Sequence, residues 1–256
     1  MGTVGWSKDE TATAPNGTPG GVEQAVDDAA GQGALARARA AAPEGGIGGA
    51  ATKLIERLLE VGIDGRGPFD SAEKVASRAL EQARGNEAQA IKIVQRDHRQ
   101  LAAVGGFVTG LGGFFTMPVS LPANLLEFFL LGTRMTAATA KIRGYDIGQP
   151  EIRSAVLLAL VGADSDDILK KAGLQLTGGR IVGLASDRLP APALMVLNKA
   201  IGFRLLGRIG QGTVGKLGRG VPIAGGLIGG GLDVYMLGRI AAQAVKEFPR
   251  QRPPAV

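Results

Sequence analysis

Residues 100–126 read QLAAVGGFVTGLGGFFTMPVSLPANLL, and this stretch decides the fold because none of its 27 residues is charged. A bilayer-spanning helix needs about 20 apolar residues, so the length alone fits a membrane span. Pro118 and Pro122 interrupt the stretch, however, and proline ends or kinks a helix. We therefore predict two apolar helices, 101–117 and 121–141, joined by a tight turn at the prolines. Such a hairpin is either buried in a helical bundle or dips into one leaflet of a membrane.

The composition fits closely packed helices. The chain has 256 residues, enough for one sizeable core, and it combines 41 glycines with only 4% aromatic residues. Glycine and alanine let helix backbones approach closely, as they do in membrane helices and tight bundles. The chain has no cysteine and one histidine, His98. Disulfides, thiolate zinc sites and cysteine nucleophiles are therefore excluded, and we predict neither a metal nor any other cofactor.

Helical patterns extend from the charge-free stretch toward both ends of the chain. On the N-terminal side, apolar residues recur at helical spacing back to Ile47, whereas residues 1–46 are rich in Gly, Ala, Pro and Thr. We predict a disordered tail over 1–46 and a helical domain over 47–250. On the C-terminal side, residues 221–248 contain glycines spaced four apart and predict one long helix. The predicted fold is all-α, a helical bundle with two apolar hairpin regions interrupted by Gly and Pro.

The charge is unevenly distributed. The net charge is +6, and residues 1–50 hold three basic and six acidic side chains, so the rest of the chain carries +9. Between Arg188 and Leu232, basic residues are threaded through apolar ones without any acid. This mixture indicates a segment lying against anionic headgroups, where each basic side chain contributes about 1 kcal/mol; the alternative is a solvated basic face on a core helix. The membrane-surface candidates are Lys199, Arg204, Arg208, Lys216 and Arg219.

Nucleotide and nucleic-acid binding are not predicted. Residues 210–216 fit both G-x-G-x-x-G and G-x-x-x-x-G-K, two patterns of phosphate-binding loops. Leu217, however, stands where a Ser or Thr would hold magnesium, and the preceding residues predict a helix where both motifs need a strand. Aromatic residues for base stacking are scarce.

Three charges stand alone in apolar surroundings: Glu127 and Arg134 in the second apolar helix, and Asp233 in the long C-terminal helix. An unpaired buried ion costs several kcal/mol, so each needs a partner. We predict that Arg134 pairs with Asp233, with Glu127 as a further partner because a spacing of seven places it on the same helix face. A metal loop is the alternative for the acidic residues 164–167, but further ligands are missing nearby, so we predict the start of a short helix there.

Several segments together resemble the EcsC family of bacterial proteins. They are the run GFVTGLGGFFTMPVSLPAN, the later Arg143-Gly-Tyr-Asp146, residues 198–205 and the closing VPIAGGLIGGGLD, in order between residues 47 and 248. Some family members carry an Asp where Ser120 stands here, which weakens a catalytic proposal built on that turn. The resemblance implies a helical fold, bacterial origin and a link to ABC-type transport or secretion, and it implies no reaction. The family-motif residues are Pro118, Pro122, Gly144, Tyr145 and Asp146.

Three function classes follow. We expect the first, a non-catalytic accessory protein on the cytoplasmic side of a bacterial membrane, peripheral or shallowly inserted. Its partners are an anionic membrane surface and an integral membrane or transporter protein. The second class is a hydrolase acting on a lipid or peptide through Glu127, Asp146 or Asp233, but these carboxylates have no companion His and no metal-ligand spacing. The third is a soluble cytoplasmic scaffold whose apolar hairpins are all internal.

Overall fold

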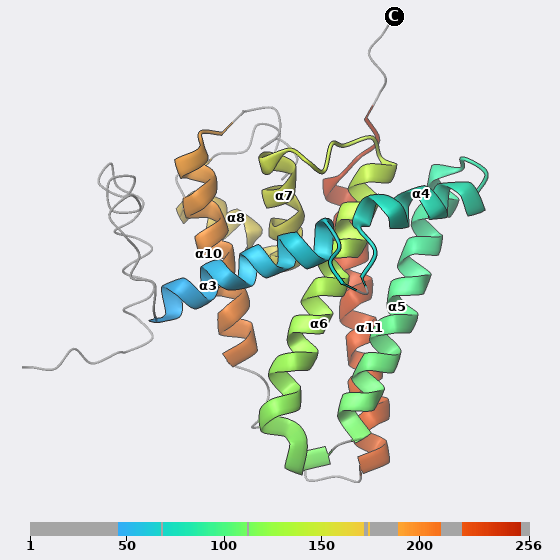
Figure 1. Ribbon diagram of the computed structural model, residues 1–256, viewed down its shortest axis with the longest axis vertical. Coiled ribbons are helices and arrows are strands. Elements are labelled where there is room, and N and C mark those ends of the chain that lie inside the picture. The colour runs from blue at the N-terminus through green and yellow to red at the C-terminus, as the bar shows by residue number, and fades with distance from the viewer. Residues whose placement is uncertain are drawn as a thin grey trace, which may run out of the picture.

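The structure is a computed structural model that describes residues 46–67, 69–111, 113–171, 174, 189–210 and 222–251 (Figure 1). For residues 47, 105–111, 113–124, 163, 209–210 and 222–229 it describes the backbone alone. The predicted disordered tail, residues 1–46, lies outside the described residues except for Gly46, which begins helix α3.

The described residues form helices and contain no strand, which confirms the predicted all-α class. The C-terminal segment is one long helix, as its pattern predicts. In chain order the elements are α3 (Gly46–Arg57), the π-helical η1 (Leu58–Ile63), α4 (Ala72–Gln82), α5 (Glu87–Leu111), α6 (Gly113–Ile142), α7 (Pro150–Val161), the 3₁₀ turn η2 (Gly162–Asp164), α8 (Ser165–Lys171), α10 (Ala191–Gly210) and α11 (Pro222–Glu247).

Three long helices, α5, α6 and α11, lie side by side along the long axis of the molecule (Figure 1). The contact between α5 and α11 is the most extensive of any helix pair in the described part of the chain. α5 ends, and α6 and α11 begin, at the lower end of Figure 1, so α5 is antiparallel to the other two. At the upper end, α7 contacts both α6 and α10, and α10 packs on α3. The three long helices therefore extend beyond the shorter ones at one end.

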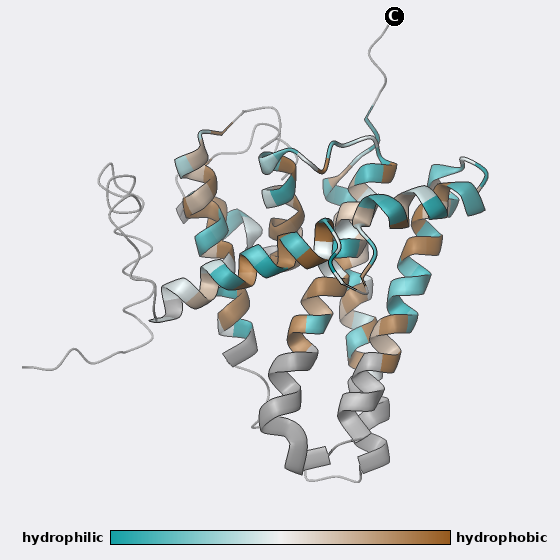
Figure 2. Cartoon of the chain, in the orientation of Figure 1, coloured by the Kyte–Doolittle hydropathy of each residue, from teal (hydrophilic) through white to brown (hydrophobic). Residues whose placement is uncertain are grey.

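The core is richest around α7, which has no polar face. From Ile152 to Val161, every residue of α7 except Arg153 is buried, as expected for a helix that is apolar all round. Burying a side chain such as Leu157 or Leu158 contributes about 1.5–3 kcal/mol to folding. Figure 2 shows the contrast with the periphery: the coloured part of α6 is mostly apolar, whereas α4 is mostly hydrophilic.

Two glycines let neighbouring elements approach closely. A Cβ atom at Gly202 of α10 would lie 2.8 Å from the carbonyl oxygen of Ala51 in α3. A Cβ atom at Gly62 of η1 would lie 2.8 Å from the Cβ of Thr133 in α6. Any larger residue would push these elements apart, because the backbone and β-carbons they meet have no other rotamer to adopt.

The predicted turn at Pro118 and Pro122 is wrong. α5 continues to Leu111, α6 begins at Gly113, and both prolines lie within α6. The end of α5 and the start of α6 lie in a glycine-rich stretch, residues 110–113, and glycine is the weakest helix former after proline. Each proline removes one backbone hydrogen bond from α6, and the packing of α6 against α5 and α11 outweighs this local preference.

Candidate functional site

Arg134 of α6 carries a buried charge. Its side chain is 5% exposed, and its Nε and Nη2 atoms have no hydrogen-bond partner among the described residues. The guanidinium carbon lies 4.9 Å from the centroid of the Phe69 ring. Burial lowers the pKa of the guanidinium, and the negative charge of Asp70 opposes this shift. Among the described residues the cation is therefore stacked on an aromatic ring, with no carboxylate paired to it.

The structure does not bring Arg134 together with Asp233 or Glu127. No ion pair joins Arg134 to either carboxylate in the part of the chain that is described. Glu127 is exposed, and seven residues separate it from Arg134 by about 10 Å along α6. A Cβ atom at Gly132 would lie 3.4 Å from Ile240 Cδ1, so this part of α6 faces α11 about two turns beyond the partly exposed Asp233. Arg134 is thus too far along the helix axes from Asp233 and Glu127 to form an ion pair with either.

His98 of α5 is buried close to Arg134. Its Nδ1 atom lies 2.8 Å from the carbonyl oxygen of Val94, and its Nε2 atom has no partner among the described residues. Burial lowers the pKa of His98 to about 4; the hydrogen bond with Val94 opposes the shift, and the positive charge of Arg134 adds to it. The imidazole is therefore neutral at physiological pH and donates from Nδ1.

The motif residues Gly144, Tyr145 and Asp146 end α6 and hold the C-terminal segment. Gly144 has a φ of 93°, and the N–H of Tyr145 donates to the Ala140 carbonyl at 3.1 Å, which completes a Schellman cap. The Tyr145 hydroxyl donates to the carbonyl of Pro249 at 2.9 Å. Asp146 Oδ1 accepts from the backbone N–H two residues later, also at 2.9 Å. These contacts give all three residues structural roles.

Three of the five predicted membrane-surface residues, Lys199, Arg204 and Arg208, are described, and all lie on α10. Lys216 and Arg219 lie outside the described residues. Lys199 is partly exposed. Arg204 and Arg208 both contact Asp164, a carboxylate just after the end of α7.

Arg204 and Arg208 join α10 to the end of α7. Arg204 Nε and Arg208 Nη2 lie 2.9 and 2.7 Å from Asp164 Oδ2. Arg208 also donates to the carbonyls of Leu160 and Val161 at 3.3 and 2.9 Å. Hydrogen bonds from Arg204 and then Arg208 hold the pKa of the Asp164 carboxyl below its usual range. A cation at the last carbonyls of a helix also matches the helix dipole, so both arginines stabilise this contact.

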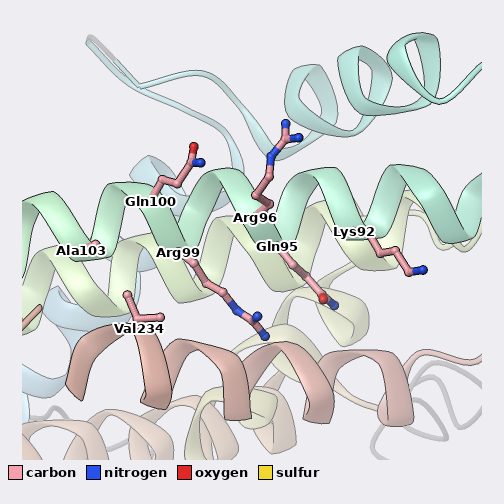
Figure 3. A pocket seen from close by; sticks show the side chains of 7 residues that line it. All are labelled: Lys92, Gln95, Arg96, Arg99, Gln100, Ala103 and Val234. Atoms are coloured by element: carbon pink, nitrogen blue, oxygen red, sulfur yellow. The ribbon is translucent and has the colours of Figure 1, made fainter. Parts of the chain in front are cut away.

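An open groove with a volume of about 400 Å³ lies between α5 and α11 (Figure 3). Figure 3 shows Gln95 and Arg99 extending from α5 toward α11, while Arg96 and Gln100 project from the other side of α5. No carboxylate lines the groove in the described part of the chain, so it is basic. Its lining residues are Lys92, Gln95, Arg96, Arg99, Gln100, Ala103 and Val234.

Arg99 lies across α11 because Gly238 leaves room for it. A Cβ atom at Gly238 would lie 3.1 Å from Arg99 Nη2. Arg99 Nε is buried without a hydrogen-bond partner, and neither Arg99 nor Lys92 forms an ion pair with a described residue. The sequence-based candidates do not include this groove. The sequence pattern that could have indicated the groove is the spacing of Lys92, Gln95 and Arg99. This spacing places one amide and two cations on the same helix face.

Large apolar side chains are exposed on the same two helices, and we call them the apolar belt. Exposed apolar residues are common singly, but a gathering on adjacent helices marks an interaction site. The members of the apolar belt are Leu101 and Val104 of α5 and Leu232, Tyr235 and Met236 of α11, each between 43% and 63% exposed.

The apolar belt occupies one level of the bundle, next to the groove. α5 and α11 run in opposite directions, with Ala103 and Val234 lining the same groove and Arg99 packing on Gly238. On both helices the apolar belt lies between the contact of Arg99 with Gly238 and the end of the bundle where α5 ends and α11 begins. Lys92 and Arg96 lie on the other side of this contact.

Toward this end of the bundle the three long helices carry no charge, and Leu101, Val104 and Leu232 of the apolar belt lie within the uncharged runs. No charged residue occurs in α5 after Arg99, in α6 before Glu127 or in α11 before Asp233. We call these runs of 11 to 14 residues the charge-free end. They are about 16–21 Å long, against about 15 Å for half of a bilayer's hydrocarbon core. None of the described helices has the length and apolar character needed to cross a whole bilayer.

Asp146 lies apart from the other two candidate hydrolase residues. Glu127 is exposed on α6, Asp146 follows the other end of α6, and Asp233 belongs to α11. Where the structure describes side chains, no three His, Asp or Glu residues form a group that could hold a metal ion.

Comparison with known proteins gives no match to a protein-family model, to a curated protein or to a solved structure. The resemblance to the EcsC family therefore stays a prediction that rests on the residues quoted for it.

Proposed function

We propose that this protein is a peripheral membrane protein that inserts the charge-free end of α5, α6 and α11 into one leaflet. The observation that carries the proposal is the order of residues along the bundle. The charge-free end comes first and carries the apolar belt near its inner limit, and the basic residues Lys92, Arg96 and Arg99 of α5 come next. A membrane surface has the same order, with hydrocarbon, an interface that favours residues such as Tyr235, and headgroups that attract cations.

The dimensions of the charge-free end support insertion into one leaflet. At about 16–21 Å it matches the roughly 15 Å of one hydrocarbon layer plus part of the interface. Helical backbone satisfies its own hydrogen bonds, so it enters hydrocarbon without the penalty that an irregular loop would carry. The EcsC resemblance adds to this proposal the cytoplasmic side of a bacterial membrane and an integral membrane or transporter protein as partner.

Site-specific fluorescence tests the insertion, because the chain has no cysteine and one introduced cysteine labels uniquely. Tyr235→Cys places an environment-sensitive fluorophore in the apolar belt. Met195→Cys places it on α10, where Met195 is 50% exposed, and serves as the matched control. We expect vesicles to shift the emission at 235 to the blue and to leave the emission at 195 unchanged.

Removal of the apolar belt provides a second measurement. The triple variant Leu232→Ser, Tyr235→Ser, Met236→Ser should no longer float with vesicles, because burying these side chains drives insertion. Met195→Ser should float like the unaltered protein. Equal emission shifts at 195 and 235, or full flotation of the triple variant, would overturn the proposal. Absence of any vesicle binding would instead favour an apolar belt covered by protein.

A further inference from the structure

We propose that the groove between α5 and α11 binds the phosphate group of an anionic phospholipid. This inference rests on the membrane association proposed above, for which it names the ligand. The groove borders the apolar belt, so a phosphate at the level of Arg99 would leave its acyl chains along the charge-free end.

The chemistry of the groove fits a phosphate. The guanidinium of Arg99 is a planar fork that binds phosphate through two parallel hydrogen bonds, and Lys92 supplies a mobile point charge. Gln95 lies between them on the same helix face, where its amide can donate to an ester oxygen or accept from a glycerol hydroxyl. No described carboxylate lines the groove to neutralise these cations. A volume of about 400 Å³ is ample for one headgroup.

The packing of Arg99 indicates a prepared site rather than a loose surface cation. Gly238 leaves the space in which the Arg99 guanidinium lies against α11. The buried Nε–H of Arg99 is a hydrogen-bond donor that has no acceptor among the described residues. Arg96, by contrast, projects from the other side of α5, and its Nη2 lies 2.9 Å from Asp97 Oδ1. Of the three basic residues that line the groove, Arg99 and Lys92 are therefore the ones without a carboxylate partner among the described residues.

Binding to vesicles of phosphatidylcholine, with and without phosphatidylglycerol, tests the assignment. Arg99→Gln should lower the partition coefficient onto the mixed vesicles by at least about tenfold, because the loss of even one charge-assisted hydrogen bond implies a change of this size. Arg99→Lys keeps the charge but loses the planar fork of the guanidinium. Its partition coefficient should lie between those of the unaltered protein and Arg99→Gln. Arg239→Gln, an equal change of charge on the exposed side of α11, is the matched control and should change binding far less. Equal losses for Arg99→Gln and Arg239→Gln would overturn the site in favour of general electrostatic attraction.

A pair of glycine variants tests the geometry without any change of charge. Gly238→Ala places a methyl group against the Arg99 guanidinium, whereas Gly231→Ala adds one to the same helix where nothing lies within 4 Å. Both replace glycine by the better helix former, so they share any effect on α11 itself. We expect only Gly238→Ala to reduce the preference for phosphatidylglycerol. The same preference in both variants would overturn the proposal that Arg99 must occupy this space.

Soluble phosphate distinguishes a lipid from a free anion. We expect inorganic phosphate at millimolar concentration to leave the bound fraction unchanged at constant ionic strength, because a free anion lacks the acyl chains. Displacement of the protein by inorganic phosphate would overturn the lipid assignment. The label at position 235 separates this inference from the proposed function: if it still inserts into vesicles while Arg99→Gln binds normally, only the phosphate site fails.

Discussion

Arg134 keeps a charge in a buried position without a carboxylate partner among the described residues. Stacking on Phe69 offsets part of the desolvation cost, by about 0.5–2 kcal/mol. We therefore expect Arg134→Met, which keeps most of the apolar stem, to raise the free energy of unfolding in urea by about 1–2 kcal/mol. Arg134→Lys, which retains the charge but not the planar stack, should lower it. A loss of about 3–5 kcal/mol in Arg134→Met would instead indicate a buried ion pair.

His98 makes the stability depend on pH. Its pKa falls from 6.5 to about 4 on folding, so between these values the unfolded chain binds a proton that the folded one does not. Stability is fully present above pH 6.5 and decreases as the pH falls toward 4, by about 3 kcal/mol from this residue. Urea unfolding of His98→Gln, which lacks histidine altogether, should show a smaller decrease. Equal decreases in both proteins would assign the pH dependence to carboxylates alone.

At the scale of elements, Arg208 stabilises the contact between α7 and α10 through specific hydrogen bonds more than through its positive charge alone. Arg208 caps the last carbonyls of α7 and pairs with Asp164. Because its side chain is 36% exposed, we expect Arg208→Gln to lower the free energy of unfolding by only about 1 kcal/mol. Lys199→Gln removes the same charge from the same helix and should change it by less than about 0.5 kcal/mol. Chemical denaturation measures both, and similar values would contradict the capping role.

Three helix ends coincide with residue types that favour helix boundaries in general. Asn86 accepts from the N–H of Gln89 at 3.0 Å, α7 begins at Pro150, and Gly144 follows the end of α6, all as their sequence signals indicate. The turn expected at Pro118 does not form, because the packing around α6 outweighs the local effect of proline. A strong breaker indicates where a helix tends to end, and neighbouring helices decide whether it does.

Contacts between distant helices were not predictable from the sequence. Helical periodicity places residues on a face, but the axial level at which two helices meet depends on how the whole bundle packs. Arg134 and Asp233 share suitable chemistry yet lie at different levels, whereas Arg99 meets Gly238 because α5 and α11 are antiparallel at that register. The groove is for this reason visible only in the folded chain.

At the scale of the whole molecule, membrane contact has an apolar part and a charged part, located on adjacent levels of the bundle. Raising the salt concentration shortens the Debye length from about 10 Å at 0.1 M to about 3 Å at 1 M, whereas apolar burial is not screened. We expect binding to phosphatidylglycerol vesicles to fall with salt to the level measured on neutral vesicles and to remain there.

The sequence also assigns a charged contribution to the α10 segment, and cosedimentation at low salt can separate it from the groove. Lys199→Gln, Lys216→Gln and Arg219→Gln together should weaken binding to anionic vesicles if that segment lies on the membrane, by a few-fold for each residue at about 1 kcal/mol. Arg204 and Arg208 are left intact, because their loss would loosen α10 from α7. An unchanged partition coefficient would confine the charged contact to α5 and α11. Complete release of the unaltered protein at 1 M salt would refute the apolar part, since insertion of the charge-free end predicts binding that salt does not remove.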